Sequence, residues 1–323
     1  MILNSLQYKD IAFNTPYASL SMDTLSHNQN YLDIQNKYIK KFNRQKQQTF
    51  SFTKNGFFAI FMQLKGKIAV SLGESEAIVA GAKIALSCGQ DIVFLNIQKN
   101  GELDFSCIDS SLDYIFVSSY IMDTFVQVDL HKIQTLTQAK IISNASATMD
   151  LDTSDILLLD GYKLTKQGEL GVIIYNDWLE DSYVGDTHLA TLCMCLEGLE
   201  QQTRNEEVKA IFLAKLQETF QENLFLFIEP NLSLDWVLHI GLKHIKAREI
   251  IRTMALDDIH LTNGEGCSLG LMQPSRVIQE MGYSELESRW CLALDFSTTY
   301  SSEQIDSFIK LLYKRYKQIK ALI

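Results

Sequence analysis

The sequence predicts an α/β protein with a mostly parallel sheet in a large domain, followed by a smaller α+β domain. From about residue 49 to residue 175, short β-rich runs alternate with less apolar segments, which is typical of parallel strands covered by helices. After Pro230, single strands and helices lead to a long amphipathic helix. We therefore divide the chain into an N-terminal segment at 1–48, a large domain at 49–230 and a small domain at 231–323.

The first expected element is a helix within residues 28–48, because Tyr31, Ile34, Tyr38 and Phe42 follow helical spacing. The basic residues of this segment lie mostly on the other side, which indicates a solvated face. Strands of the large domain are expected at 50–52, 67–72, 91–97, 113–119, 140–145, 155–161 and 171–177. Residues 188–222 then give a long helical pattern with a break near residues 203–205.

The small domain is predicted from the same kinds of pattern. Strands are expected at 234–242, 259–263 and 290–296, and a helix at 246–254. A short helix is expected at 274–282, with Pro274 in its first turn. Residues 301–323 form a closing helix that Ser301 or Ser302 can cap.

Composition excludes several classes of function. The chain holds 29 Lys and Arg against 39 Asp and Glu, and a net charge of −10 does not favour binding to nucleic acid or anionic lipid. The longest apolar runs, at 57–64 and 156–159, are too short for a membrane span, and the first residues lack the plan of a signal peptide. A cytoplasmic location is expected. Without paired CxxC spacing, the six cysteines are interpreted as reduced thiols.

One cysteine lies in a setting that suits chemistry. Cys267 is flanked by Gly264, Gly266 and Gly270 between an expected strand and an expected helix, so its thiol can be exposed and mobile. These surroundings make it a candidate nucleophile, with an unreactive loop thiol as the alternative.

The segment from Cys267 to Val277, with the spacing Cys-Ser-x-Gly-x-x-x-Pro-Ser-x-Val, resembles the cysteine loop of the cysteine desulfurases. These are pyridoxal phosphate (PLP) proteins of the class V aminotransferase family, with a fold type I large domain. Residues 151–175 are similar to the family segment that carries the Schiff-base lysine, and residues 67–79, 100–105 and 238–306 resemble other parts of it. The N-terminal segment is shortened relative to the family.

The resemblance implies two catalytic residues. Lys163 matches the lysine that forms the Schiff base with PLP and acts as general base. Cys267 matches the thiolate that accepts sulfur from substrate cysteine as a persulfide. The resemblance also implies PLP as cofactor, a homodimer or a heterodimer with a paralogue, and an iron-sulfur scaffold or sulfur-acceptor protein as partner.

The phosphate positions of the family are changed in this chain. A Gly-Thr turn, a Ser three residues before the lysine and a Thr from the partner subunit match Phe57, Asp160 and Asp186. A one-residue slip would place Thr187 at the last position instead. A carboxylate repels a phosphate dianion by about 1 kcal/mol per charge pair at contact in water, and by several times more in a partly buried cup.

The ring and substrate positions are also changed. Asn144 matches the Asp that keeps the pyridine nitrogen protonated, and Ala147 matches the Gln that binds the phenolic oxygen. Ser75 matches the stacking His, Tyr162 matches the His before the lysine, and Ala293 matches the Arg that clamps the substrate carboxylate.

All these changes fall on one pocket, which favours a catalytically degenerate relative with weak or no PLP binding. Two alternatives stay open. One is an active desulfurase that passes sulfur from L-cysteine through Lys163 and a Cys267 persulfide. The other is a PLP-independent persulfide relay or a dimeric interaction partner in sulfur transfer. The scattered histidines predict no metal site.

Overall fold

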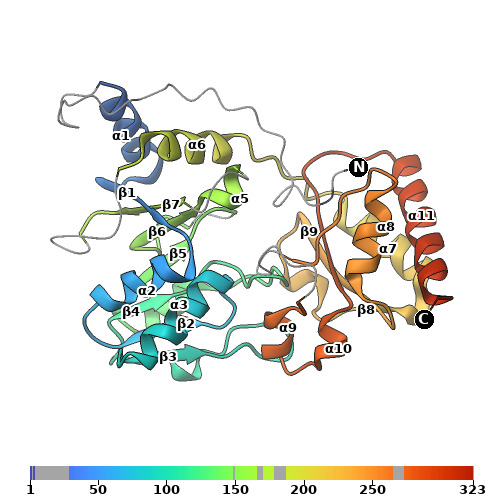
Figure 1. Ribbon diagram of the computed structural model, residues 1–323, viewed down its shortest axis with the longest axis horizontal. Helices are drawn as coiled ribbons and strands as arrows, with labels where there is room; N and C mark the ends of the chain where they lie inside the picture. The colour runs from blue at the N-terminus through green and yellow to red at the C-terminus, as the bar shows by residue number, and fades with distance from the viewer. Residues whose placement is uncertain are drawn as a thin grey trace.

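The computed structural model describes residues 1, 3, 29–147, 150–165, 170–177, 187–264 and 273–322. Seven strands form one sheet in the order β1-β7-β6-β5-β4-β2-β3, at the left of Figure 1. β3, β2, β4, β5 and β6 are parallel neighbours, and β7 is antiparallel to β6 and β1. This confirms the predicted α/β class with a mostly parallel sheet. The strands are Lys46–Ser51 (β1), Ile68–Ser71 (β2), Ile92–Leu95 (β3), Tyr114–Phe116 (β4), Lys140–Asn144 (β5), Ile156–Asp160 (β6) and Leu170–Tyr175 (β7).

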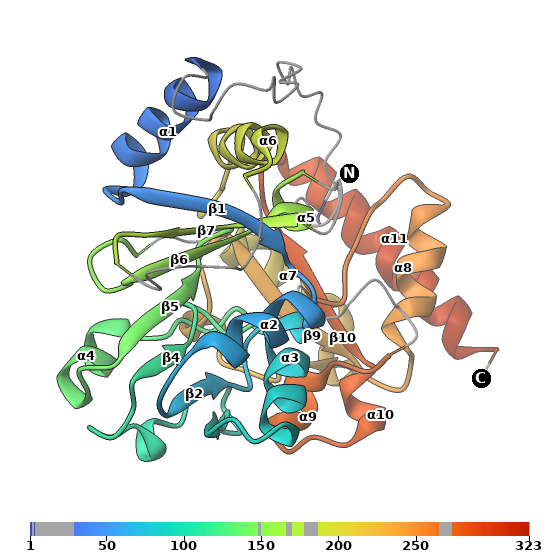
Figure 2. The ribbon, with the colours of Figure 1, turned by 60° about the vertical axis from the view of Figure 1, so that its left-hand side comes forward.

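Helices cover both faces of this sheet, as the continuous apolar runs of its strands require. In β6, Leu157 and Leu159 pack in a cluster with α1 (Gln29–Phe42) and α6 (Leu189–Glu200). Ile156 and Leu158 pack on the other face with α2 (Lys54–Gln63) and α3 (Glu76–Ser87). Figure 2 shows α1 and α6 above β1 and β7, with α2 and α3 below them. Two short helices, α4 (Leu130–Leu136) and α5 (Gly161–Thr165), lie in connections between strands.

The first expected helix is present and occupies the part of residues 28–48 that has helical spacing. It ends at Phe42, and Asn43 has a positive φ of 53° that breaks the helical path. Residues from Lys46 onward pair with β7 as an edge strand. Residues 46–48, at the end of the 28–48 segment, therefore belong to a strand. The long pattern at 188–222 divides as expected, because α6 ends at Glu200 and α7 (Lys209–Phe220) begins eight residues after Gln201.

A second, antiparallel sheet has the order β10-β9-β8 and lies at the right of Figure 1. Its strands are Leu224–Phe225 (β8), Val237–Leu242 (β9) and Cys291–Asp295 (β10). Side chains of α7, α8 (Ala247–Ala255) and α11 (Ser302–Lys320) share one hydrophobic cluster with β9 and β10. α7 and β8 precede residue 231, so packing around this sheet begins before the expected start of the small domain, and that boundary stays a prediction.

Two expected elements of the C-terminal part differ from the structure. Residues 259–263 form no strand of the described sheets. Thr262 makes an isolated bridge with Ala293, and the backbone of His260 accepts from the Leu3 N–H and donates to the Met1 carbonyl, each at 3.0 Å. The expected short helix begins as α9 at Arg276 (Arg276–Glu280), with Ser275 as its N-cap, because the Ser275 hydroxyl accepts from the Ile278 amide at 3.2 Å. Pro274 therefore precedes the helix instead of lying in its first turn. A further short helix, α10, follows at Glu285–Ser288.

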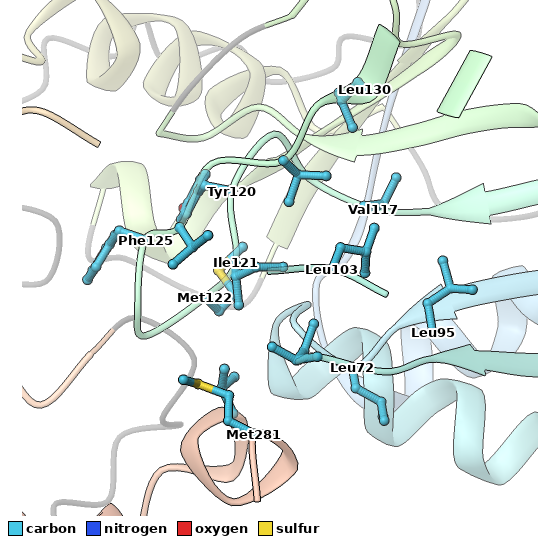
Figure 3. Close-up of a cluster of buried hydrophobic side chains, with 14 of the residues drawn as sticks. Leu72, Leu95, Leu103, Val117, Tyr120, Ile121, Met122, Phe125, Leu130 and Met281 are labelled. Atoms are coloured by element: carbon cyan, nitrogen blue, oxygen red, sulfur yellow. The ribbon is translucent and has the colours of Figure 1, made fainter. Parts of the chain in front are cut away.

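A fourth hydrophobic cluster joins the two parts of the chain. It combines residues that follow strands of the large sheet with residues from α9 and β10. Figure 3 shows Leu72, Ile121 and Met122 from the first group near Met281 from the second. Among the described helices, none has the length and apolar character needed to cross a membrane.

Arg276 adds polar contacts to this junction, and its loss is expected to weaken the fold. Its guanidinium donates to Glu76 Oε2 at 2.8 Å, to the carbonyl of Glu74 and to the carbonyl of Leu72. Arg276→Ala should lower the free energy of unfolding by about 2–3 kcal/mol in urea titrations, because several charge-assisted bonds are lost together. Arg248→Ala is the matched control, since Arg248 pairs only with its exposed neighbour Glu249 among the described residues. That change should cost less than about 1 kcal/mol. Equal losses of free energy of unfolding in Arg276→Ala and Arg248→Ala would contradict a stabilising role of Arg276 at this junction.

Candidate functional site

Polar side chains meet beyond the carboxyl ends of four parallel strands. Glu74 and Ser75 follow β2, Ser118 follows β4, Asn144 ends β5, and Lys163 follows β6. The carboxyl ends of parallel strands lie at one edge of a sheet, where α/β proteins bind their ligands. The structure therefore brings together three predicted positions, Ser75, Asn144 and Lys163, and adds two residues that the sequence analysis did not identify.

Lys163 lies in α5, and its side chain is buried with a relative exposure of 7%. Its Nζ donates to the hydroxyl of Tyr120 at 3.3 Å and lies 3.2 Å from Sδ of Met122. The Tyr120 ring stacks in turn on Phe125, with centroids 6.0 Å apart. Figure 3 shows Tyr120, Met122 and Phe125 in the connection between β4 and α4. Bulky side chains of this connection thus contact the lysine amine directly.

Two residues of this connection adopt a left-handed backbone. Asp123 has a φ of 65° and Phe125 a φ of 62°, a conformation that is costly for bulky residues. The buried carboxylate of Asp123 accepts from the Ser275 hydroxyl at 2.6 Å. The connection between β4 and α4 is therefore fixed to the start of α9, which helps to keep Tyr120 and Met122 against Lys163.

Asp160 is the last residue of β6 and caps the short helix that carries Lys163. Its Oδ1 accepts from the backbone N–H of Lys163 at 3.2 Å. Its own backbone N–H donates to the Ser146 hydroxyl at 2.6 Å. A carboxylate suits this position, because the first amides of a helix have no partner within the helix. The Lys163 amide is consequently used by a side chain of the protein itself.

Asn144 is almost fully buried and is oriented by Ser146. Its Oδ1 accepts from the backbone N–H of Ser146 at 3.0 Å and from the Ser146 hydroxyl at 2.6 Å. These two bonds fix which end of the amide is the acceptor. The buried Nδ2 has no hydrogen-bond partner among the described residues. Asn144 therefore presents an amide donor, where a carboxylate would present a charge.

Glu74 and Ser118 are the two site residues that the sequence analysis missed. The Ser118 hydroxyl donates to Glu74 Oε1 at 2.6 Å and accepts from the backbone N–H of Asn144 at 3.2 Å. Burial raises the pKa of Glu74, while the bond from Ser118 and the charge of Lys163 oppose that rise. The hydroxyl of the neighbouring Ser75 is buried without a partner among the described residues. The only signal in the sequence was that both residues closely follow apolar strands.

The remaining predicted positions lie elsewhere or are not described. Phe57 is fully buried in α2, where its ring packs on Phe50 and Phe52 with centroids 5.4 and 4.9 Å away. This gives Phe57 a packing role, and its place in a phosphate site stays a prediction. Ala293 is fully buried in β10, opposite His239 of β9. Asp186 and Cys267 lie outside the described residues.

Three solved structures share this architecture over nearly the whole chain. A NifS-like protein superposes with a TM-score of 0.71 at 10% identity, covering 93% of this chain and 90% of its own. A NifS-like protein from Rickettsia africae gives a TM-score of 0.62 at 16% identity, with coverages of 94% and 92%. A structure described as SspA in complex with cysteine gives 0.64 at 14% identity, with coverages of 93% and 95%.

The chain has a cysteine desulfurase-like fold. The order of the seven strands, with one antiparallel strand near the edge, agrees with the fold type I architecture of PLP-dependent transferases. No protein-family model and no curated protein matches the sequence. At these identities the likeness to NifS-like proteins shows the fold alone, so chemistry must be argued from the residues around Lys163. The described residues contain no group of three or more side chains suited to hold a metal ion.

Proposed function

We propose that this protein is a catalytically degenerate cysteine desulfurase-like protein with weak or no binding of PLP. The observation that carries the proposal is the direct contact of Tyr120 and Met122 with the amine of Lys163. A lysine that forms a Schiff base needs open space at its nitrogen. That space must hold the aldehyde carbon of PLP and the pyridine ring to which this carbon is attached. Here an aromatic ring and a thioether, both almost fully buried, lie at that nitrogen.

The other residues of the site also do not fit PLP. The Asp160 carboxylate already accepts from the Lys163 amide and would oppose a phosphate dianion at this position. The repulsion between two unit charges 4 Å apart is about 4 kcal/mol at the effective dielectric constant near a protein surface. Asn144 offers a neutral donor, which cannot stabilise a protonated pyridine nitrogen as a carboxylate does. Ser75 has no aromatic face to stack on a ring.

The absorption spectrum of the purified protein tests the proposal. We expect no visible Schiff-base band after addition of PLP, and no release of sulfide from L-cysteine, because the amine is covered and the phosphate is repelled. Lys163→Ala is the control, since it removes the only amine that the proposal concerns. A visible band in the wild-type protein that disappears in Lys163→Ala would overturn the proposal and support an active PLP enzyme.

A protein with this fold and no cofactor chemistry can still act through its surface. We infer that it works as a homodimer, or as a heterodimer with a catalytically competent paralogue, in sulfur transfer to a scaffold or acceptor protein. The inference rests on the cysteine desulfurase-like fold and on the resemblance of the cysteine loop. Affinity purification of the tagged protein should recover a desulfurase or a sulfur-acceptor protein. Recovery of a monomer without either partner would contradict this role.

A further inference from the structure

A cavity of about 280 Å³ lies beyond the carboxyl end of β5 and next to the C-terminal end of α6. Its lining combines apolar side chains with two polar ones near the end of α6: Ala145, Ala147, Leu199, Gln202 and Arg204. Gln202 is tied to the protein, since its Nε2 donates to the carbonyl of Ser146 at 2.5 Å. The cavity therefore has apolar walls and one charged group, which is the usual composition of a site for a small organic ligand.

The charged group of this cavity, Arg204, is held in a fixed orientation. Its guanidinium carbon lies 4.1 Å from the ring centroid of Trp236, and one terminal nitrogen donates to the carbonyl of Ala147. Trp236 is buried, so the stacking partner is itself rigid. A guanidinium stacked on an aromatic face loses little further freedom when it binds a planar anion. Arg204 is thus preorganised for such a ligand.

Arg204 also lacks an ion-pair partner among the residues that the structure describes. No described carboxylate lies within 4.0 Å of its guanidinium. Glu206, Asp295 and Tyr120 act on it electrostatically from farther away. A guanidinium carries five N–H donors, and the described structure uses one of them in a hydrogen bond. Donors in the planar geometry that binds carboxylates in pairs are therefore available at the cavity.

We propose that this cavity is a binding site for a small carboxylate with a short apolar tail, held by Arg204. The volume suits a ligand of about amino-acid size, and Ala145, Ala147 and Leu199 provide the surface for its tail. The guanidinium binds the carboxylate, while Trp236 holds the guanidinium from behind. The cavity adjoins the candidate site, since Ala147 matches a ring position of the family, but binding of this ligand does not require PLP.

A second cationic cavity is less suited to this role. It is lined by Lys246, Arg248 and Arg289, with Asn263 and Gln273. Arg248 and Arg289 already pair with Glu249 at 2.8 Å and Glu285 at 2.7 Å. An anion would have to compete with these carboxylates, whereas Arg204 has no such competitor among the described residues.

Titration of the full-length protein with butyrate, followed by tryptophan fluorescence at constant ionic strength, tests the proposal. Butyramide is the matched probe, because it has the same shape without the charge. We expect a saturable signal with butyrate, weaker binding of butyramide, and loss of the signal in Trp236→Phe. Arg204→Gln should weaken butyrate binding by about tenfold or more, because a charge-assisted pair is replaced by a neutral contact.

Two further variants complete the design. Arg248→Gln removes a surface arginine outside the cavity and should leave butyrate binding unchanged. Because Arg204→Gln could also disturb the packing on Trp236, Arg204→Lys is measured beside it and should retain part of the affinity through its charge. Equal binding of butyrate and butyramide, absence of saturation, or unchanged affinity in Arg204→Gln would each overturn the proposal.

Discussion

Replacing Gly161 by alanine is expected to destabilise the protein severely, by more than about 3 kcal/mol. Gly161 is the first residue of α5, between β6 and Lys163. A Cβ atom added here would lie 1.9 Å from the carbonyl oxygen of Leu170 and 3.1 Å from its carbonyl carbon. These are backbone atoms of β7, which pairs with β6 inside the sheet. The overlap therefore cannot be relieved by turning a side chain and requires β6 and β7 to separate.

Urea unfolding of graded variants measures this effect. At Gly198, a Cβ would lie 2.7 Å from the Leu164 carbonyl oxygen, so Gly198→Ala should destabilise the protein less than Gly161→Ala does. Leu256 has an exposure of 84%, and Leu256→Ala should cost less than about 0.5 kcal/mol. If Gly161→Ala fails to fold, Gly198→Ala should still lose more free energy of unfolding than Leu256→Ala. If Gly161→Ala were as stable as the wild-type protein, this would contradict the close contact between α5 and the backbone of β7.

Replacing His239 by leucine is expected to stabilise the protein, most strongly in acid. His239 lies in β9 and is 1% exposed, and neither ring nitrogen has a hydrogen-bond partner among the described residues. Unsatisfied buried polar groups cost about 1–3 kcal/mol each, and leucine has a similar volume without polar atoms. Burial also lowers the pKa of His239 from 6.5 to about 3. The imidazole therefore stays neutral in the fold under conditions that protonate it in the unfolded chain.

The direction of the pH effect follows from this difference. Between about pH 6.5 and pH 3 the unfolded chain binds one more proton than the folded protein at this residue, so stability falls as the pH falls. The loss reaches about 1.4 kcal/mol per pH unit, which is about 2 kcal/mol at pH 5. His239→Leu should remove this contribution in urea titrations between pH 7.5 and pH 5. His131→Gln, at an exposed residue of α4, should leave the slope as in the wild type. An unchanged slope in His239→Leu would contradict the interpretation.

The sequence predicted the elements that depend on local patterns. Apolar runs such as 156–159 and 291–294 became β6 and β10, and Ser301 caps α11 through a bond from the Gln304 amide, as capping chemistry predicts. The errors occurred where distant contacts decide the structure. Residues 46–48 end the segment in which a helix is expected but pair with β7, and residues 259–263 have a strand composition but form no strand of the described sheets. Pattern alone contains no information about such partners.

The residues of the candidate site also divide into those that the sequence could locate and those that depend on distant contacts. Lys163 and Asn144 could be located because a resemblance aligned whole segments around them. Glu74 and Ser118 could not, since their importance comes from a hydrogen bond between residues 44 positions apart. The contact of Tyr120 with Lys163 spans 43 positions and depends on how the connection after β4 folds back. Distances in the folded chain, and not residue types, decide which groups surround the lysine.

The hydrophobic cluster between the two sheets has a consequence for movement. Val277, Ile278 and Met281 of the C-terminal part are almost fully buried in the same cluster as Leu72 and Ile121, which follow strands of the large sheet. A hinge rotation that separated the two sheets would expose these side chains to water, at about 25 cal/mol for each Å² of apolar area. Both parts should consequently melt in one cooperative transition, and movement of the two sheets relative to each other is restricted to small displacements.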